Sequence, residues 1–233
     1  MTGNYFLDAL EPEDRDAVVR LLRPVDLADG EVLIRQDAAV TLVHFPVRAQ
    51  LANITAAPEG QHLETAVIGR EGLSGLAPFM AAAPSAWQVV CTVGGDAYVI
   101  PAEALRALSD RRPDLRHRLL ALTHFYQAQA NQLALCNTYH RATARLARWL
   151  LTTSDLTGAA ELRLTQEQIA NSLGVQRTSM VEAFAVLKAE RLIRHTRSRM
   201  EILDRAGLKR RACGCYDQLH RLAIELKVLP GNR

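Results

Sequence analysis

One segment, residues 164–204, constrains the fold of this chain more than any other. Thr165 stands where a helix N-cap is expected, and Gln168 follows three residues later, which is the spacing of a capping box. Gly174 follows an apolar helical pattern, at the kind of position where a helix ends in a left-handed residue. A second helical pattern then runs over Gln176–Leu187. The segment therefore predicts two short helices joined by a tight turn.

The two predicted helices each have an apolar inner face. These faces consist of Ile169, Ala170 and Leu173 in the first helix and Met180, Phe184 and Leu187 in the second. A polar, basic pair of strands follows, with residues 194–199 as its hairpin. This order is typical of a winged helix-turn-helix, whose second helix enters the major groove of DNA. The alternative is an ordinary helical hairpin packed on a small sheet.

The residues that this interpretation turns outward have side chains suited to DNA. Short polar groups, a guanidinium and a carboxylate can read base edges, and the amides at helix N-termini bind phosphates. Arginines in the hairpin would lie along the phosphate backbone. We predict nine DNA contacts: Thr165, Gln166, Gln176, Arg177, Thr178, Ser179, Glu182, Arg197 and Arg199.

Charge is distributed unevenly along the chain. Residues 138–233 hold 17 Lys or Arg and 9 Asp or Glu, a net charge of +8. Residues 1–137 hold 11 Lys or Arg and 16 Asp or Glu, a net charge of −5. The net charge of +3 for the whole chain conceals this difference. A basic second half favours a polyanionic partner, and here it coincides with the helix-turn-helix pattern. We therefore expect this half to bind double-stranded DNA.

The first half has a different pattern. A helical pattern covers residues 6–22, and a short helix is expected over Leu73–Ala82. Short β-like runs separated by turn residues fill most of the remaining sequence as far as Pro101. These runs are Glu31–Arg35, Leu42–Pro46, Gln50–Thr55, Gln61–Ile68, Trp87–Val93 and Asp96–Pro101. Many short strands at such spacing predict an antiparallel barrel or roll.

Pro113 then opens a long predicted helix that ends near Asn137. Its apolar positions alternate at spacings of four and three, which is the pattern of a paired helix, and one polar member can fix the register. A stripe of this length could also lie on the chain's own roll. We predict a homodimer interface formed by Leu115, Leu119, Leu122, Tyr126, Gln129, Leu133 and Cys136.

These observations define an α+β chain with three parts: a roll over residues 1–112, a dimerisation helix over 113–137 and a winged helix-turn-helix over 138–233. No run of apolar residues is long enough to span a membrane, and the N-terminal sequence lacks the apolar core of a signal peptide. The four cysteines form no disulfide framework. We expect reduced thiols, a cytoplasmic location and no membrane partner.

The order of roll, long helix and winged helix resembles the Crp/Fnr family of bacterial transcription regulators. The resemblance is carried by GREGLSGL (residues 69–76), RLARWLL (145–151) and LTQEQIANSLGVQRTSMVEAFAVLKAERLI (164–193). It covers nearly the whole chain and implies a cyclic-nucleotide-binding-like roll. The chain looks most like a branch of that family with a cysteine-containing tail, here ACGCYDQL (212–219).

The resemblance also implies an effector pocket in the roll, which in the family holds cyclic AMP between a glycine-glutamate turn and an Arg-Ser/Thr-Ala triplet. We assign this pocket to Gly69, Arg70, Glu71, Gly72, Ser85 and Ala86. Pro84 replaces the arginine of the triplet and can neither donate a hydrogen bond from its amide nor neutralise a phosphate. Nothing in the sequence brings Arg70 into its place. We therefore expect an effector other than cyclic AMP.

Other cofactors of the family are also disfavoured. The iron–sulphur branch needs clustered N-terminal cysteines, whereas the first cysteine here is Cys91. Haem needs an axial ligand, for which His44, His62, His117 and His124 are available. His117 and His124 stand one heptad apart, but a histidine on a helix surface is far more often solvated than a haem ligand. Cys213 and Cys215 supply only half of a tetrahedral zinc site, so we expect packed thiols and no metal there, with metal binding or oxidation as the alternative.

By the same resemblance, Arg177, Thr178 and Glu182 match the positions that read bases, where the family usually has Arg, Glu and Arg. Thr178 replaces the usual glutamate and Glu182 replaces the usual arginine, so the family's usual half-site should not be assumed. We predict a dimeric, sequence-specific transcription regulator with an unidentified small-molecule effector and RNA polymerase as a further partner. The alternative is a DNA-binding or interaction protein whose roll binds nothing. No catalytic motif is present, so we do not expect an enzyme.

Overall fold

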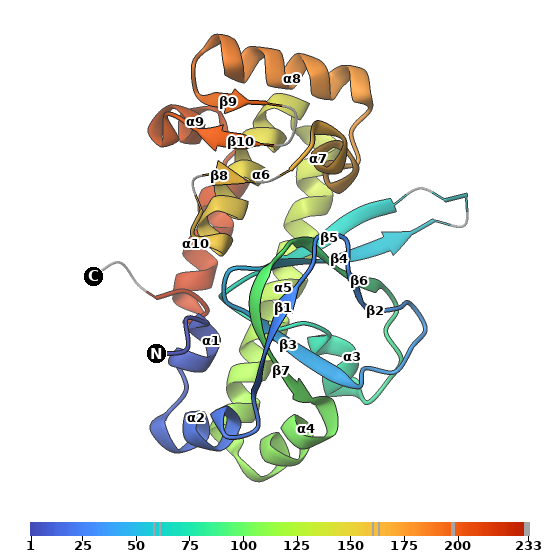
Figure 1. Cartoon of the computed structure of the whole chain (residues 1–233), viewed down its shortest axis with the longest axis vertical. Coiled ribbons are helices and arrows are strands. Elements are labelled where there is room, and N and C mark those ends of the chain that lie inside the picture. The colour runs from blue at the N-terminus through green and yellow to red at the C-terminus, as the bar shows by residue number, and fades with distance from the viewer. Residues whose placement is uncertain (58, 61, 160, 163, 197–198, 231–233) are drawn as a thin grey trace.

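The computed structural model describes residues 1–230 except 58, 61, 160, 163, 197 and 198. It has two lobes, a β-roll and a smaller helical lobe, which lie at opposite ends of one long helix (Figure 1). The predicted fold class is confirmed: an antiparallel roll comes first, then the long helix, then a helix-turn-helix with a small sheet.

Two antiparallel sheets form the roll, one with strand order β1-β7-β3 and one with order β2-β6-β4-β5. The strands are β1 (Arg23–Leu27), β2 (Val32–Ile34), β3 (Leu42–Pro46), β4 (Gln50–Ala56), β5 (His62–Ile68), β6 (Gln88–Val93) and β7 (Gly95–Pro101). Buried side chains from both sheets, including Phe45, Leu51 and Ile68, meet in one core. The β4–β5 hairpin reaches away from the rest of the roll (Figure 1).

The N-terminal half differs from the sequence prediction in three elements. The predicted helix over residues 6–22 is two helices, α1 (Tyr5–Asp8) and α2 (Pro12–Val19), because Pro12 has no amide to continue α1 and instead opens α2. Strand β1 was not predicted because it is short and has only one buried side chain, Leu27. Helix α4 (Ala102–Arg111) was also missed, whereas a short helix within Leu73–Ala82 is present as α3 (Leu76–Ala81).

Helix α5 (Pro113–Tyr139) joins the two lobes, and its buried face corrects the predicted dimer interface. All seven predicted interface residues, Leu115, Leu119, Leu122, Tyr126, Gln129, Leu133 and Cys136, are buried within their own chain. The first four belong to the core of the roll, and the Gln129 side-chain oxygen accepts a hydrogen bond of 2.7 Å from the amide of Val67. This stripe therefore cannot face a second chain, and it is the alternative, packing on the chain's own roll, that the structure shows.

The second lobe has its own core around Trp149, Phe184 and Leu187. Its helices are α6 (Ala142–Thr157), α7 (Gln166–Leu173), α8 (Arg177–Ala189) and α9 (Arg205–Arg211), and its sheet has the order β8-β10-β9, with β8 (Glu161–Leu162), β9 (Ile193–His195) and β10 (Met200–Ile202). Figure 1 shows α8 lying across the far end of this lobe, away from the roll.

Helix α10 (Cys215–Glu225) runs back along α5 from the second lobe toward the roll (Figure 1). Tyr216 near its start packs in the second core, whereas Ala223 and Val228 pack in the core of the roll. Arg118 of α5 holds the following turn through a hydrogen bond of 2.7 Å to the carbonyl of Lys227. The C-terminal segment thus joins both cores, and a domain division at residue 138 stays a prediction.

Candidate nucleic-acid interface and ligand cavities

The turn between α7 and α8 has the local geometry that its sequence predicts. The Thr165 hydroxyl accepts a hydrogen bond of 3.2 Å from the Gln168 amide, and the Gln168 side chain accepts one of 2.8 Å from the Thr165 amide, which completes the capping box. Gly174 has a φ of +58°, a left-handed conformation that favours glycine. These two features fix where α7 begins and ends, and so they set the position of α8.

Helix α8 buries one face and presents the other to solvent. Met180, Ala183, Phe184 and Leu187 are buried. Five of the predicted DNA contacts lie on its first turns: Gln176, Arg177, Thr178 and Glu182 are exposed, and Ser179 is half-buried. The structure therefore brings these five side chains together at one solvent-facing helix end.

Two exposed arginines among the predicted DNA contacts each pair with a carboxylate. Arg177 lies 3.1 Å from Glu167 of α7, and Arg199, which directly precedes β10, lies 3.4 Å from Glu161 of β8. Arg177 therefore pairs with Glu167 and not with Glu182 of its own helix. Exposed ion pairs contribute little to stability, so a phosphate or a guanine can displace the carboxylates. Arg197 lies outside the described residues.

Two predicted phosphate contacts already have partners in the fold. Both the amide and the hydroxyl of Thr165 bond to the Gln168 side chain, at 2.8 and 2.9 Å. The Gln166 side chain lies 3.2 Å from the ring of His195 in β9. Burial and the charge of Lys188 lower the pKa of His195, so its ring is neutral near pH 7. Gln166 and His195 therefore join α7 to the wing.

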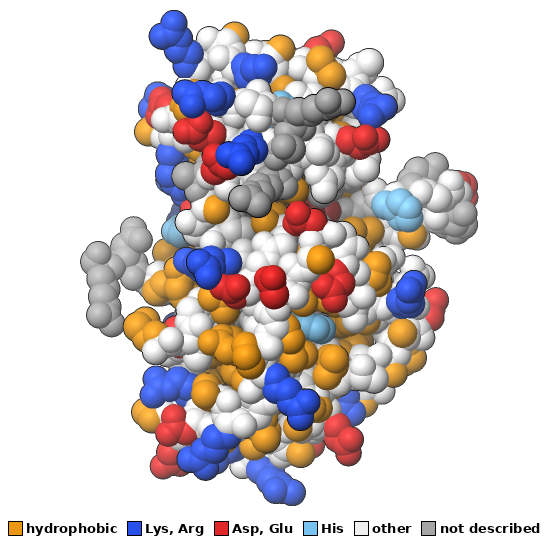
Figure 2. Space-filling view, viewed as in Figure 1, with side chains coloured by type: hydrophobic (Ala, Val, Ile, Leu, Met, Phe, Trp, Pro, Cys, Tyr) orange, Lys and Arg blue, Asp and Glu red, His pale blue; other side chains and the backbone are white. Residues whose placement is uncertain are grey.

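One residue on the outer face of α8 was not predicted from the sequence. Val181 has 58% of its surface exposed, although it is apolar, and it follows Arg177 by one helical turn. An apolar side chain on a recognition helix can contact a thymine methyl group. Its outward helical position was the available signal. Around α8, α9 and the β9–β10 pair, Figure 2 shows several Lys and Arg side chains with acidic side chains between them.

A cavity of about 260 Å³ lies between the roll and α5. Its lining comes from β4 and β5, from the start of α3, from Trp87 and from α5: Asn53, Thr65, Ala66, Ile68, Gly75, Leu76, Ala77, Trp87, Thr123, Tyr126, Gln127 and Ala130. None of the six predicted pocket residues, all of which are described, is among them. The predicted pocket residues therefore do not line this cavity, and an effector pocket at these six residues stays a prediction.

The GREG turn, residues 69–72, makes contacts within the fold. The Glu71 carboxylate accepts hydrogen bonds of 2.9 and 3.0 Å from the amide of Gly69, while Gly72 packs against Tyr126. Arg70 points toward the N-terminus, where it donates to the Tyr5 hydroxyl at 3.1 Å. The Ser85 hydroxyl donates to the Trp87 carbonyl at 2.7 Å, and Ala86 is exposed. Glycine at this cavity comes instead from Gly75.

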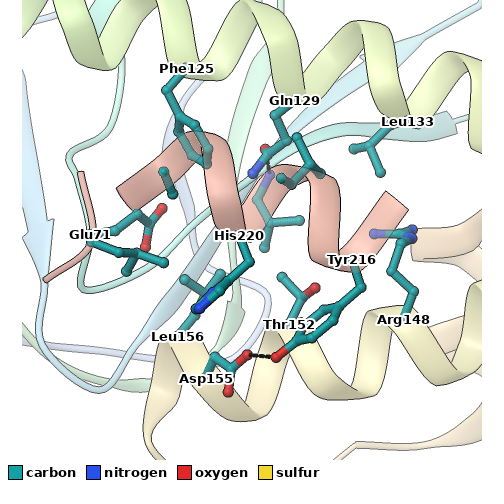
Figure 3. A pocket seen from close by; sticks show the side chains of 14 residues that line it. Glu71, Phe125, Gln129, Leu133, Arg148, Thr152, Asp155, Leu156, Tyr216 and His220 are labelled. Carbon is teal, nitrogen blue, oxygen red and sulfur yellow. Dashed lines mark hydrogen bonds between the residues drawn. The ribbon is translucent and has the colours of Figure 1, made fainter. Parts of the chain in front are cut away.

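Glu71 lines a smaller cavity of about 60 Å³ where the two lobes meet. Figure 3 shows Glu71 opposite Arg148 and Asp155 of α6 and Tyr216 and His220 of α10. The Tyr216 hydroxyl donates a hydrogen bond of 2.6 Å to Asp155. Burial raises the pKa of Glu71 to about 7, against the opposing effect of the Gly69 amide. This space holds roughly two water molecules.

Comparisons with known proteins agree with this geometry. Residues 144–211 match the family model of the Crp-like helix-turn-helix domain. This part of the chain is therefore similar to Crp-like helix-turn-helix domains. The predicted resemblance of the chain to the Crp/Fnr family is confirmed by this match and by the folds of solved structures. A search of curated proteins finds no match.

Three solved structures illustrate the shared fold. FixK2 from Bradyrhizobium japonicum has a TM-score of 0.70 at 15% identity, with 83% of this chain and 98% of that chain covered. The regulator CLP from Xanthomonas campestris, described as c-di-GMP responsive, has a TM-score of 0.65 at 13% identity. The match covers 82% of this chain and 99% of that chain. A Crp/Fnr-family transcriptional regulator from Thermus thermophilus has a TM-score of 0.61 at 19% identity, with 82% of this chain and 98% of that chain covered. Within the described residues, no helix is both long and apolar enough to cross a membrane.

Proposed function

We propose that the protein is a homodimeric, sequence-specific DNA-binding transcription regulator. The observation that carries this proposal is the outer face of α8: in a Crp-like domain, Arg177, Thr178 and Glu182 are exposed and their helix is held by the capped α7 and Gly174. Arg177 can pair with guanine, Glu182 can accept from a cytosine amino group, and Thr178 and Val181 can contact thymine methyl groups. The β9–β10 wing, including Arg199, lies along the phosphates.

Dimerisation uses the exposed face of α5. Its exposed residues repeat at alternating spacings of three and four: His117, Leu120, His124, Gln127, Asn131, Ala134 and Thr138. Leu120 has half of its surface exposed, and Leu135 beside the stripe has 46%. A 3-4 repeat of this kind pairs two parallel helices and places two recognition helices for a two-fold symmetric DNA site.

The cavity between the roll and α5 is the effector site in this proposal. Among the described residues, those that line it carry no charged side chain, so the ligand is an uncharged molecule and not a cyclic nucleotide. The Asn53 side-chain oxygen and the Trp87 indole nitrogen have no hydrogen-bond partner among the described residues, which favours a ligand with one donor and one acceptor. Thr123 and Gln127 link the cavity to the α5 face that pairs with the second chain.

Selection of binding sites from random duplex DNA tests the function, with and without a small-molecule cell extract. We expect a two-fold symmetric site. Arg177→Ala should then cost about 1–3 kcal/mol of affinity and relax one base position. Arg116→Ala is the matched control, because Arg116 is also exposed and also pairs with a carboxylate, Asp110 at 3.2 Å, but lies on the roll side. Equal losses for both variants would contradict the proposal.

The comparison with and without extract distinguishes a roll that binds an effector from a roll that binds nothing. A DNA site that is recovered more strongly with extract supports the effector cavity. Ala130→Phe fills that cavity from α5, so it should abolish the effect of the extract and leave the DNA affinity without extract intact. Identical affinity under both conditions would favour a regulator whose roll binds nothing.

A further inference from the structure

Four potential metal ligands meet where the end of α5 faces the junction of α9 and α10. Cys136 lies in the last turn of α5, and His140 follows it by four residues. Cys213 lies between α9 and α10, and Cys215, after Gly214, is the first residue of α10. The ligand atoms of these four residues all lie within 4.8 Å of one another. Residues separated by more than 70 positions in the sequence therefore form one compact set.

The separations within this set fit a tetrahedral zinc ion. Zn–S bonds of about 2.3 Å and Zn–N bonds of about 2.0 Å give tetrahedral edges of roughly 3.8 Å between sulphurs and roughly 3.6 Å between sulphur and nitrogen. Here the Cys136 and Cys213 sulphurs lie 3.5 Å apart, and the Cys215 sulphur lies 3.4 Å from Nδ1 of His140. A small expansion of the set accommodates the ion.

The surroundings of the four residues suit a buried, negatively charged centre. All three cysteines are buried, and the Gln132 amide donates a hydrogen bond of 3.0 Å to the Cys215 sulphur, as outer-shell groups do at metal sites. Two arginines of α6, Arg145 and Arg148, lie beside the thiols and are buried as well. A buried guanidinium requires a counter-charge. Zinc held by three thiolates and one imidazole carries a net charge of −1 and supplies it.

We propose that Cys136, His140, Cys213 and Cys215 bind one Zn²⁺ ion as a structural site. Four protein ligands leave no open coordination position, which distinguishes a structural from a catalytic zinc. All four ligands lie outside residues 144–211, the part of the chain that the Crp-like model covers, with two before it and two after it. The ion fastens the DNA-binding lobe to the end of the long helix, across the bend between α5 and α6. This proposal does not depend on the proposed function.

Metal content tests the proposal directly. The full chain, purified with reductant and without chelator, should contain one zinc ion per chain by elemental analysis. Exchange for Co²⁺ should give the absorption of a tetrahedral cobalt site with thiolate charge transfer. The double variant Cys213→Ser and Cys215→Ser should lose both signals. Cys91→Ser is the control, because Cys91 is a buried free cysteine inside the roll, and it should retain the ion.

A second variant covers the case in which the double variant does not fold. His140→Cys converts the set to four thiolates, and it should retain zinc while its cobalt form gains charge-transfer intensity. Zinc that stays bound in a folded double variant would overturn the proposal. The proposal would also be overturned if the reduced chain contains no metal and takes up no cobalt. A Cys136–Cys213 disulfide in the native protein, detected by mass spectrometry, would assign the thiols to redox chemistry instead.

Discussion

Glu64 places an ionisable group in the contact between the two lobes, and its burial predicts how stability changes with pH. This residue of β5 is only 6% exposed, and its carboxylate accepts a hydrogen bond of 3.1 Å from the indole of Trp149 in α6. Burial raises the pKa of Glu64 from 4.5 to about 7, and the Trp149 hydrogen bond and the charge of Arg148 only partly oppose it. The folded chain therefore keeps a proton that the unfolded chain has lost.

The sign and size of the effect follow from this difference. Because the folded state binds more protons between pH 4.5 and 7, the free energy of unfolding falls as pH rises through that window and levels off above it. Between pH 5 and pH 8 the loss from Glu64 amounts to about 2.5 kcal/mol. Glu64→Gln keeps an oxygen that can accept from Trp149 but does not titrate, so this loss should disappear.

Urea unfolding at several pH values, followed by tryptophan fluorescence, measures this difference. We expect the variant to be more stable than the natural chain at pH 8, with the advantage shrinking toward pH 5. Glu71 still titrates in both proteins and cancels from the comparison. Glu103→Gln, which changes an exposed carboxylate of α4, is the control and should follow the natural chain. Parallel pH curves for Glu64→Gln and the natural chain would refute the reasoning.

Two further predictions concern the turn and the dimer. Gly174→Ala should lower the free energy of unfolding by about 1–2 kcal/mol, because its φ of +58° suits glycine and a Cβ there would lie 2.8 Å from Leu63; an unchanged urea midpoint would contradict this. Leu120→Glu should convert a dimer to a monomer in sedimentation experiments, whereas Leu42→Glu, with similar exposure on β3, should leave the dimer intact. A dimer that persists in the first variant would exclude the proposed α5 face.

Features determined by neighbouring residues could be predicted from the sequence, and those determined by distant packing could not. The capping box and the turn at Gly174 depend on a few adjacent residues, and both were predicted correctly. The repeat in α5 identified a buried stripe but could not tell whether the chain's own roll or a second chain buries it. The GREG turn resembles a pocket in composition, yet its carboxylate bonds to its own backbone.

The four-residue thiol and imidazole set shows the same limit. Cys136 and His140 are spaced by four residues on one helix, as metal ligands often are, and Cys213 and Cys215 stand two residues apart. The expectation of no metal rested on Cys213 and Cys215 alone, which supply half of a site. Only the fold brings the two pairs together. The predicted DNA contacts on α8 needed no such information, because exposure follows from helical spacing alone.

The return of α10 along α5 has a consequence for how this chain acquires its fold during synthesis. The core of the roll includes Ala223 and Val228, and Arg118 of the long helix bonds to a carbonyl 109 residues later in the sequence. A ribosome therefore releases the roll with part of its apolar interior still uncovered, and that gap persists until the whole DNA-binding lobe has emerged. The core of the roll is therefore completed last, although the roll is synthesised first.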